Sequence, residues 1–179
     1  PEIGLVDAST YTVYETDDSI LWSTTVTDAS SHATGSVVFD FEGDGYPEVV
    51  YGDEISLWVF DGRNGDVRLM ETVHESRTLH ECPTAADVDG DGSAEIIIIN
   101  GGSHYNAKTE GMFVIGSATS SWQAGRQVWN QHGYSIVNIN DDSFSGDGTL
   151  DTGKALAQAR GAYARHEVLT PTLESDGAL

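Results

Sequence analysis

Short apolar segments alternate with polar, glycine-rich turns along residues 1–142 of the chain. The segments are rich in Val, Ile, Thr, Tyr, Trp and Phe, which is typical of half-buried β-strands. The expected strands are residues 1–6, 10–15, 20–26, 37–39, 48–51, 56–62, 67–73, 85–86, 94–100, 111–117 and 121–129. The pattern therefore predicts an all-β fold.

An aspartate-rich motif interrupts these strands at a regular spacing. Residues 40–48 (DFEGDGYPE) recur 47 positions later as residues 87–95 (DVDGDGSAE), and a degraded copy begins near Asn138. Residues 1–4 match residues 47–50, so a further copy of the motif is expected just before residue 1. Three strands between motifs and one strand entering each motif give about four antiparallel strands per unit of about 46 residues, which indicates β-propeller blades.

The repeat region is expected to cover residues 1–142, with units at about 1–36, 37–83 and 84–142. The C-terminal extension, 143–179, begins with many turn residues, has a helical pattern over residues 154–167 and ends in an acidic tail. Three blades are fewer than the four to eight of a closed propeller. Open edges and apolar faces invite pairing. We therefore expect an incomplete propeller that identical subunits, or missing blades of a parent chain, would complete.

The acids of the two full motifs are hard oxygen ligands of the kind that Ca²⁺ prefers. A nine-residue loop would use side chains 1, 3, 5 and 9 and the carbonyl of residue 7. The expected ligands are Asp40, Glu42, Asp44, Tyr46 and Glu48 in the first motif and Asp87, Asp89, Asp91, Ser93 and Glu95 in the second. An EF-hand is excluded, because position 12 of each motif lies in an apolar strand where that loop needs a bidentate Glu.

Two calcium ions are expected, and a third, weaker site would involve Asn138, Asn140 and Asp142, whose two amides lower the ligand charge. The full motifs contain no His or Cys, which disfavours zinc and other transition metals. Magnesium usually keeps several waters and suits five protein ligands less well. An Asx-rich turn without an ion is the alternative, but it does not explain eight acids in two short motifs.

The motif, followed by an aliphatic strand, resembles the calcium loops of FG-GAP/VCBS-type β-propeller repeats. Such repeats occur in integrin α-subunit heads, in secreted bacterial proteins and in propeller-shaped polysaccharide lyases. The resemblance covers residues 1–142, although the Phe-Gly and Gly-Ala-Pro signatures are absent and Glu42 replaces the usual Asp at the third position. It implies a calcium-binding protein outside the cell, with a role in cell adhesion or as a structural protein.

The charge of the chain narrows the choice of partners. There are 29 acidic and 8 basic residues, with a formal net charge of −21. Nucleic acid is excluded as a partner because phosphate binding needs clustered Lys and Arg, whereas cations or a basic surface are favoured. Cys82 is the single cysteine, so no intrachain disulfide forms.

The sequence also gives expectations for processing and for membrane association. No stretch reaches the roughly 18–20 apolar residues of a membrane helix. The first residues lack an initiator Met and the features of a signal peptide. We therefore expect no membrane span and a chain that is processed or excised from a longer one.

A polar and aromatic stretch offers a candidate ligand pocket. Trp129, Gln131, His132 and Tyr134 could line a site for a carbohydrate or protein ligand, or Trp129 could simply pack between blades. Nucleophile-elbow, phosphate-loop and dinucleotide motifs are absent from the sequence, so no catalytic residue is assigned. The predicted function is an extracellular, calcium-stabilised repeat protein in adhesion or structural self-assembly, as in a filament or surface layer. The alternatives are a carbohydrate-binding or polysaccharide-lyase propeller fragment and a receptor ectodomain fragment.

Overall fold

The computed structural model describes residues 2–30, 34–72, 74–76, 81–100 and 111–125. The chain divides into two units, Pro1–Gly125 and Arg126–Leu179, and every described residue belongs to the first. The predicted boundary between residues 142 and 143 and the predicted helix over 154–167 lie outside the described residues, so both stay predictions.

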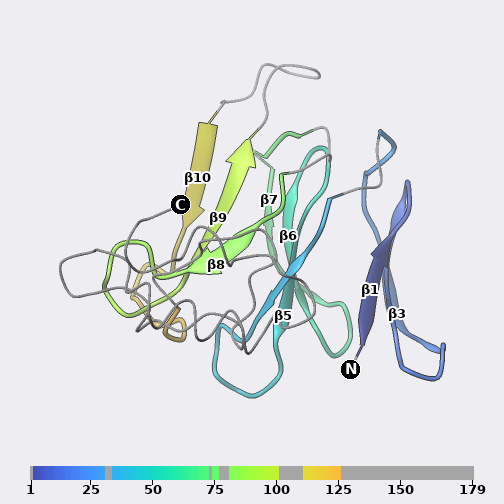
Figure 1. Cartoon of the computed structure of the whole chain (residues 1–179), viewed down its shortest axis with the longest axis horizontal. Coiled ribbons are helices and arrows are strands. Elements are labelled where there is room, and N and C mark those ends of the chain that lie inside the picture. The colour runs from blue at the N-terminus through green and yellow to red at the C-terminus, as the bar shows by residue number, and fades with distance from the viewer. Residues whose placement is uncertain (1, 31–33, 73, 77–80, 101–110, 126–179) are drawn as a thin grey trace, which may run out of the picture. The chain divides into compact units, whose positions relative to one another are not determined.

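The described residues form three antiparallel β-sheets (Figure 1). Sheet 1 contains β1 (Ile3–Val6), β2 (Thr10–Tyr14) and β3 (Ile20–Thr25). Sheet 2 contains β4 (Val37–Phe39), β5 (Glu48–Gly52), β6 (Leu57–Asp61) and β7 (Val67–Glu71). Sheet 3 contains β8 (Thr84–Ala86), β9 (Glu95–Asn100) and β10 (Gly111–Ile115). The prediction of an all-β fold is confirmed for this part of the chain, which contains no helix and hence no helix that could cross a membrane.

The strand pairing repeats from sheet 2 to sheet 3. β4 pairs with β5 so that Phe39 lies opposite Glu48, and β8 pairs with β9 so that Ala86 lies opposite Glu95. These pairs lie 47 residues apart, the spacing of the aspartate-rich motif. The sequence repeat is therefore a structural repeat, in which each motif connects a short strand to the strand beside it.

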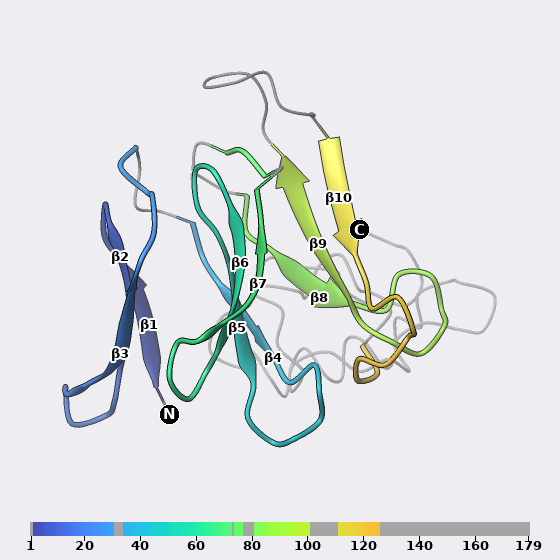
Figure 2. The same ribbon diagram turned by 180° about the vertical axis from the view of Figure 1, so that it is seen from behind.

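Sheet 2 lies between the other two sheets, as the view from behind shows (Figure 2). β5 is buried along its whole length, since Val49 and Tyr51 pack in the core shared with sheet 1 while Val50 packs in the core shared with sheet 3. This burial on both faces explains why β5 is a continuous apolar run rather than an alternating one. Trp22 of β3 also donates its indole N–H to the Gly62 carbonyl at 2.8 Å, which ties sheet 1 to sheet 2.

The core between sheets 1 and 2 is largely aromatic. The ring of Tyr11 lies 5.0 Å from Tyr51 and 5.8 Å from Trp22, between ring centroids, and Phe60 completes the cluster. Burial of one such side chain contributes about 1.5–3 kcal/mol relative to its exposure. The two sheets are therefore held by packing that depends on no metal.

The strand predicted over residues 121–129 is wrong for its described part, since residues 121–125 are irregular. The backbone hydrogen bonds of this segment go elsewhere. The Gln123 N–H donates to the Phe41 carbonyl at 2.8 Å, and the Gln123 carbonyl accepts from the Ala94 N–H at 2.9 Å. Because both partners belong to the aspartate-rich motifs, these groups are not available to pair with β10.

Candidate metal centre

The two full motifs form loops in which the first acid accepts the N–H groups of the two glycines. Loop 1 (residues 40–48) joins β4 to β5, and loop 2 (residues 87–95) joins β8 to β9. In loop 1 the first acid, Asp40, accepts the N–H groups of Gly43, Asp44 and Gly45 at 2.7, 3.1 and 2.8 Å. In loop 2, Asp87 accepts those of Gly90 and Gly92 at 2.7 and 3.2 Å. The first acid of each loop therefore folds the backbone around its own carboxylate.

The glycines of the loops allow this wrapping. Gly43 and Gly45 have φ angles of 72° and 86°, and Gly90 and Gly92 have φ angles of 79° and 87°. Glycine adopts this left-handed conformation readily, whereas a side chain would strain it. The Gly-x-Gly spacing of the motif is thus a conformational requirement of the loop.

The side chain of the ninth residue forms a hydrogen bond with the backbone N–H of the second residue in each loop. Glu48 Oε2 accepts the Phe41 N–H at 2.9 Å, and Glu95 Oε2 accepts the Val88 N–H at 2.9 Å. Glu48 is 1% exposed, and its other oxygen, Oε1, is buried without a hydrogen-bond partner among the described residues. A buried carboxylate oxygen without a donor is costly. Its environment therefore favours a cation or a proton at that point.

Loop 2 gathers three carboxylates that could hold a metal ion. Asp87, Asp89 and Glu95 each offer one oxygen, and these oxygens lie within 4.8 Å of one another. Carboxylates at such distances repel each other. A hard cation with oxygen ligands removes that repulsion, and a calcium ion accepts six to eight such ligands. The donor set and its spacing fit Ca²⁺.

The acid at the fifth position of loop 2 has a partner outside the loop. Asp91 accepts the hydroxyl of Ser120 on one oxygen and the Ser93 N–H at 2.8 Å on the other. The Ser120 hydroxyl, followed by the Ser93 amide, lowers the pKa of Asp91 below its usual value. Asp91 therefore stays ionised beside the cluster and is positioned from a distant segment.

Loop 1 differs at its third position, where Glu42 stands. Burial, reinforced by the neighbouring Glu42 carboxylate, raises the pKa of Glu48 to about 7, although the Phe41 N–H opposes the shift. Two carboxylates that approach each other in this way share a proton or a cation. Glu42 and Glu48 thus have a charge conflict, and the expected ligand set of loop 1 stays a prediction, because the acids found within 4.8 Å of one another among the described residues belong to loop 2.

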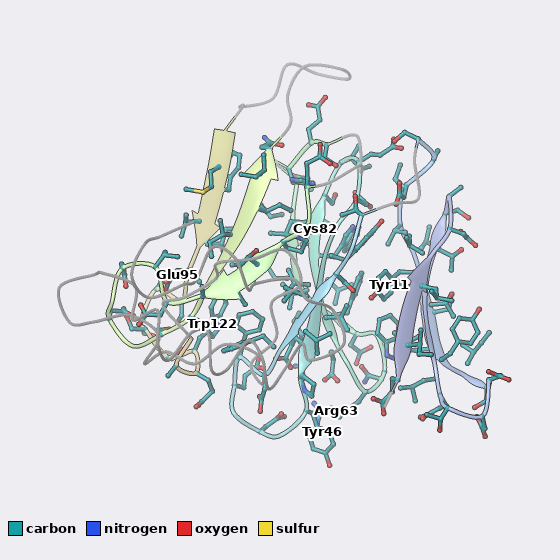
Figure 3. All side chains as sticks on the ribbon, in the orientation of Figure 1. Tyr11, Tyr46, Arg63, Cys82, Glu95 and Trp122 are labelled. Carbon is teal, nitrogen blue, oxygen red and sulfur yellow. The ribbon has the colours of Figure 1, made fainter. Side chains whose placement is uncertain are left out.

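A guanidinium group supports loop 1 from the turn after β6. Arg63 donates to both oxygens of Asp61 at 2.9 and 2.7 Å, lies 3.6 Å from Asp44, and stacks 4.6 Å above the Tyr46 ring (Figure 3). Arg63, with help from Arg68, holds the pKa of Asp61 well below its usual range. The Tyr46 ring is therefore used for stacking, and the expected ligand role of its carbonyl stays a prediction. Sequence analysis missed Arg63. The one feature that could have drawn attention to it is that the chain has only eight basic residues.

One irregular segment contacts both loops. We call residues 117–125 the bridging segment. The ring centroid of Trp122 lies 4.6 Å from that of Phe41 in loop 1. The backbone of Gln123 forms hydrogen bonds with both loops, and the Ser120 hydroxyl donates to Asp91 of loop 2. Labels for Trp122 and Glu95 mark the region in Figure 3. Sequence analysis missed the bridging segment because nothing in its own residues indicates these partners.

The other predicted site residues lie outside the described residues. These are the third motif, with Asn138, Asn140 and Asp142, and the candidate pocket with Trp129, Gln131, His132 and Tyr134. Cys82 is described, and its sulfur accepts the Gly35 N–H at 3.4 Å. It therefore links the segments that precede β4 and β8.

Comparison with known proteins supports the interpretation of the loops. An FG-GAP-like repeat matches residues 40–98, from the first residue of loop 1 into β9, and confirms the resemblance seen in the sequence. The crystal structure of the V. cholerae biofilm matrix protein Bap1 is similar, with a TM-score of 0.73 and 28% sequence identity. The match covers 83% of this chain but only 24% of that protein. Curated protein sequences give no match.

Proposed function

We propose that this chain is part of a calcium-stabilised β-propeller in an extracellular adhesion or matrix protein. The observation that carries the proposal is the duplicated loop, in which a wrapped aspartate and a buried glutamate recur with the same hydrogen bonds. The FG-GAP-like repeat and the similarity to a biofilm matrix protein support it. The role is structural or adhesive rather than catalytic.

Calcium would bind at both loops and act as a staple. The proposed ligands are the side chains of Asp40, Glu42, Asp44, Glu48, Asp87, Asp89, Asp91 and Glu95, with the carbonyls of Tyr46 and Ser93. The bound ion neutralises acids that otherwise repel, so its binding free energy becomes folding free energy. Extracellular calcium modules bind at about 10⁻⁴ to 10⁻³ M. Calcium at that level is available outside cells, which supports an extracellular location.

We infer that the three sheets are blades and that further blades cover the two end faces. On sheet 1, Ile3 and Leu5 are more than half exposed, although their counterparts in sheet 2, Val49 and Tyr51, are buried. On sheet 3, strands β9 and β10 likewise expose Ile99, Met112 and Val114. Apolar faces of this kind mark interaction surfaces. Identical subunits or blades of a parent chain would cover them, and the larger size of the similar matrix protein agrees with either source.

The basic residues of the described region are committed to structural contacts. Arg63 and Arg68 are the arginines described, no lysine is described, and both guanidinium groups bind Asp61. A lyase would need free basic groups beside its substrate to stabilise developing negative charge. Neither described arginine is therefore assigned to substrate binding.

Sedimentation velocity of the full chain, in calcium and in chelator, tests the proposal. We expect association in calcium that grows with protein concentration, and we expect Met112→Lys to weaken it because a charge is placed on an exposed blade face. Thr16→Lys, which adds the same charge in the exposed turn between β2 and β3, is the matched control. A monomer that is unchanged by calcium and by concentration would contradict the assembly role.

Incubation with polysaccharides separates the adhesive function from the lyase alternative. The full chain is mixed with acidic and neutral polysaccharides, and both retention on the polymer and unsaturated products are measured. Retention on the polysaccharide without new products supports adhesion to a carbohydrate ligand. If neither retention nor products are observed, adhesion to a protein ligand is supported instead. Appearance of unsaturated ends in proportion to protein would establish the lyase instead.

A further inference from the structure

The bridging segment is held by the two loops rather than by a sheet. It follows β10 and turns back beside loop 2 (Figure 2). Its residues are irregular, and among the described residues Gln123 makes the backbone–backbone hydrogen bonds that join it to the rest of the chain. The Gln123 N–H donates to the Phe41 carbonyl of loop 1, and the Gln123 carbonyl accepts the Ala94 N–H of loop 2. One residue therefore connects the two loops.

Side chains of the segment extend its contact with loop 1. The Trp122 ring packs on Phe41, which is buried in the core cluster that also contains Ala94 of loop 2. The Gln123 side chain lies against Gly43, where an added Cβ would overlap it. The segment is thus fitted to the same part of loop 1 in which the first acid accepts the N–H groups of the glycines.

The contact with loop 2 is equally close. The Ser120 hydroxyl donates to Asp91, and Ser120 itself has a φ angle of 47°, which is unusual for a residue other than glycine. At Gly125 an added Cβ would lie 2.6 Å from the backbone nitrogen of Asp87, the first acid of the loop. The segment therefore fits loop 2 in the closed form that the structure shows.

The state of one loop affects the other through these contacts. Nine irregular residues lose conformational freedom when they dock, and contacts with both loops offset that cost. In loop 2 the clustered carboxylates repel one another without a cation, which favours opening of the loop. Opening displaces the partners of the segment, Asp91 and Ala94. The released segment then no longer holds Phe41 and Gly43 of loop 1 in place.

We propose that the bridging segment couples calcium binding at the two loops, so that an ion in loop 2 raises the affinity of loop 1 for a second ion. The segment has two states, docked on both loops or released, and an ion in either loop favours the docked state. By linkage, an ion in loop 1 raises the affinity of loop 2 by the same factor. The inference rests on the proposed function in one respect, namely that both loops bind calcium.

A calcium titration of the full chain, followed by amide hydrogen exchange with NMR detection, measures each loop separately. The amides of Gly43 and Gly45 report on loop 1, and those of Gly90 and Gly92 report on loop 2, because each donates to the first acid of its loop. We expect exchange of the Gln123 amide, which donates to loop 1, to slow at the calcium concentration that fills loop 2.

Three variants test the coupling. Asp89→Ala removes an acid of the loop 2 cluster, and we expect the calcium midpoint of loop 1 to rise at least about fivefold. Ser120→Ala removes the bond to Asp91 and should raise the loop 1 midpoint about two- to fivefold, although Ser120 contacts loop 2. Ser121→Ala is the matched control, because it removes the same group from a bond to Ser117 within the segment and should leave both midpoints unchanged.

The outcomes separate the coupling from the proposed function. If both loops bind calcium but the loop 1 midpoint is the same in the wild-type chain, Asp89→Ala and Ser120→Ala, the coupling is wrong and the proposed function stands. A calcium response confined to the loop 2 amides also overturns the coupling. Absence of a calcium response in both loops contradicts the proposed function and the coupling together.

Discussion

In loops 1 and 2 the first acid accepts the N–H groups of both glycines and the ninth residue accepts the N–H of the second residue, but the acid at the third position is placed differently. In loop 2, Asp89 lies in a cluster with Asp87 and Glu95. In loop 1, Glu42 lies beside Glu48 and helps burial to raise the pKa of Glu48 to about 7. The third residues of the two loops differ by one methylene, and among the described residues it is loop 2 whose acids are spaced to hold a cation.

The two loops also differ in the positively charged groups that surround them. Loop 1 has a guanidinium nearby, since Arg63 stacks on Tyr46 and approaches Asp44. Among the described residues, loop 2 receives the hydroxyl of Ser120 through Asp91, and the Ala94 N–H of this loop donates to the Gln123 carbonyl. A positive charge within the protein compensates part of the repulsion in loop 1, while the described neighbours of loop 2 provide none. We therefore expect loop 2 to depend more strongly on calcium.

Asp87→Ala is the change expected to have the largest effect. It removes the carboxylate that accepts two loop N–H groups and that belongs to the metal cluster. We expect the free energy of unfolding in calcium to fall by about 2–4 kcal/mol, from the lost buried hydrogen bonds and the lost ion. Chemical denaturation measures it.

Two variants calibrate this result. Asp40→Ala in loop 1 should cost less, because that loop depends less on calcium. Asp17→Ala, which removes an aspartate that caps the turn between β2 and β3, should cost under about 1 kcal/mol. Equal losses for all three variants would show that neither loop has a special role.

Loop 1 should respond to pH when calcium is absent. The pKa of Glu48 is about 7 in the folded chain and near 4.5 when exposed. Because the folded pKa is the higher one, the stabilisation from the protonated form is fully present below pH 4.5 and is lost as pH rises through 7. The loss is up to about 3 kcal/mol.

Glu48→Gln isolates this contribution, since it keeps the shape of the side chain and does not titrate. Unfolding free energies of the wild-type chain and of this variant are measured in chelator from pH 4.5 to pH 8. Their difference should change across that interval, and calcium should suppress the change. A constant difference would show that Glu48 does not carry the charge conflict of loop 1.

Asp89→Asn should have effects of opposite sign in the two conditions. In chelator it removes one of three clustered negative charges in loop 2, which should stabilise the fold by about 0.5–1 kcal/mol. In calcium it removes a charged ligand and should destabilise by about 1 kcal/mol or more. Thermal unfolding in both buffers measures the two effects. An effect of the same sign in both would argue against an ion at the cluster.

Glu42→Asp should make loop 1 resemble loop 2, with the smallest expected effect. Shortening the side chain withdraws its carboxylate from Glu48 and restores the third residue found in loop 2. We expect the calcium affinity of loop 1 to rise about three- to tenfold, as measured by calorimetry, with the pKa of Glu48 moving down. Weaker binding than in the wild-type chain would show that the longer arm is the better ligand at this site.

The strands and the loop repeat follow from the sequence because they rest on local patterns. Alternation and β-branched residues mark the strands of sheets 1 and 2, and the Gly-x-Gly spacing marks loops that need left-handed backbone. The 47-residue offset of the motif is also the offset of the strand pairing. Each of these features depends on residues that are close together in the chain or on the repeat itself, so it can be predicted from the sequence.

The bridging segment and the Glu42–Glu48 contact depend on residues far apart or on side-chain reach. Gln123 bonds to residues 82 positions earlier and 29 positions earlier in the chain, and no local periodicity records that. The local pattern around Trp122 therefore predicts a strand, although the segment is irregular. Arg63 escapes notice for a related reason, since its stacking on Tyr46 joins two different turns of sheet 2.

Thermal unfolding of the full chain across a calcium titration, with magnesium at equal ionic strength as the comparison, tests most directly whether the two loops are calcium sites that stabilise the fold. We predict a midpoint that rises with calcium, saturates near the millimolar range and rises less for Asp87→Ala than for Asp40→Ala, while magnesium has little effect. Calcium and magnesium curves that coincide, in the wild-type chain and in both variants, would contradict the account.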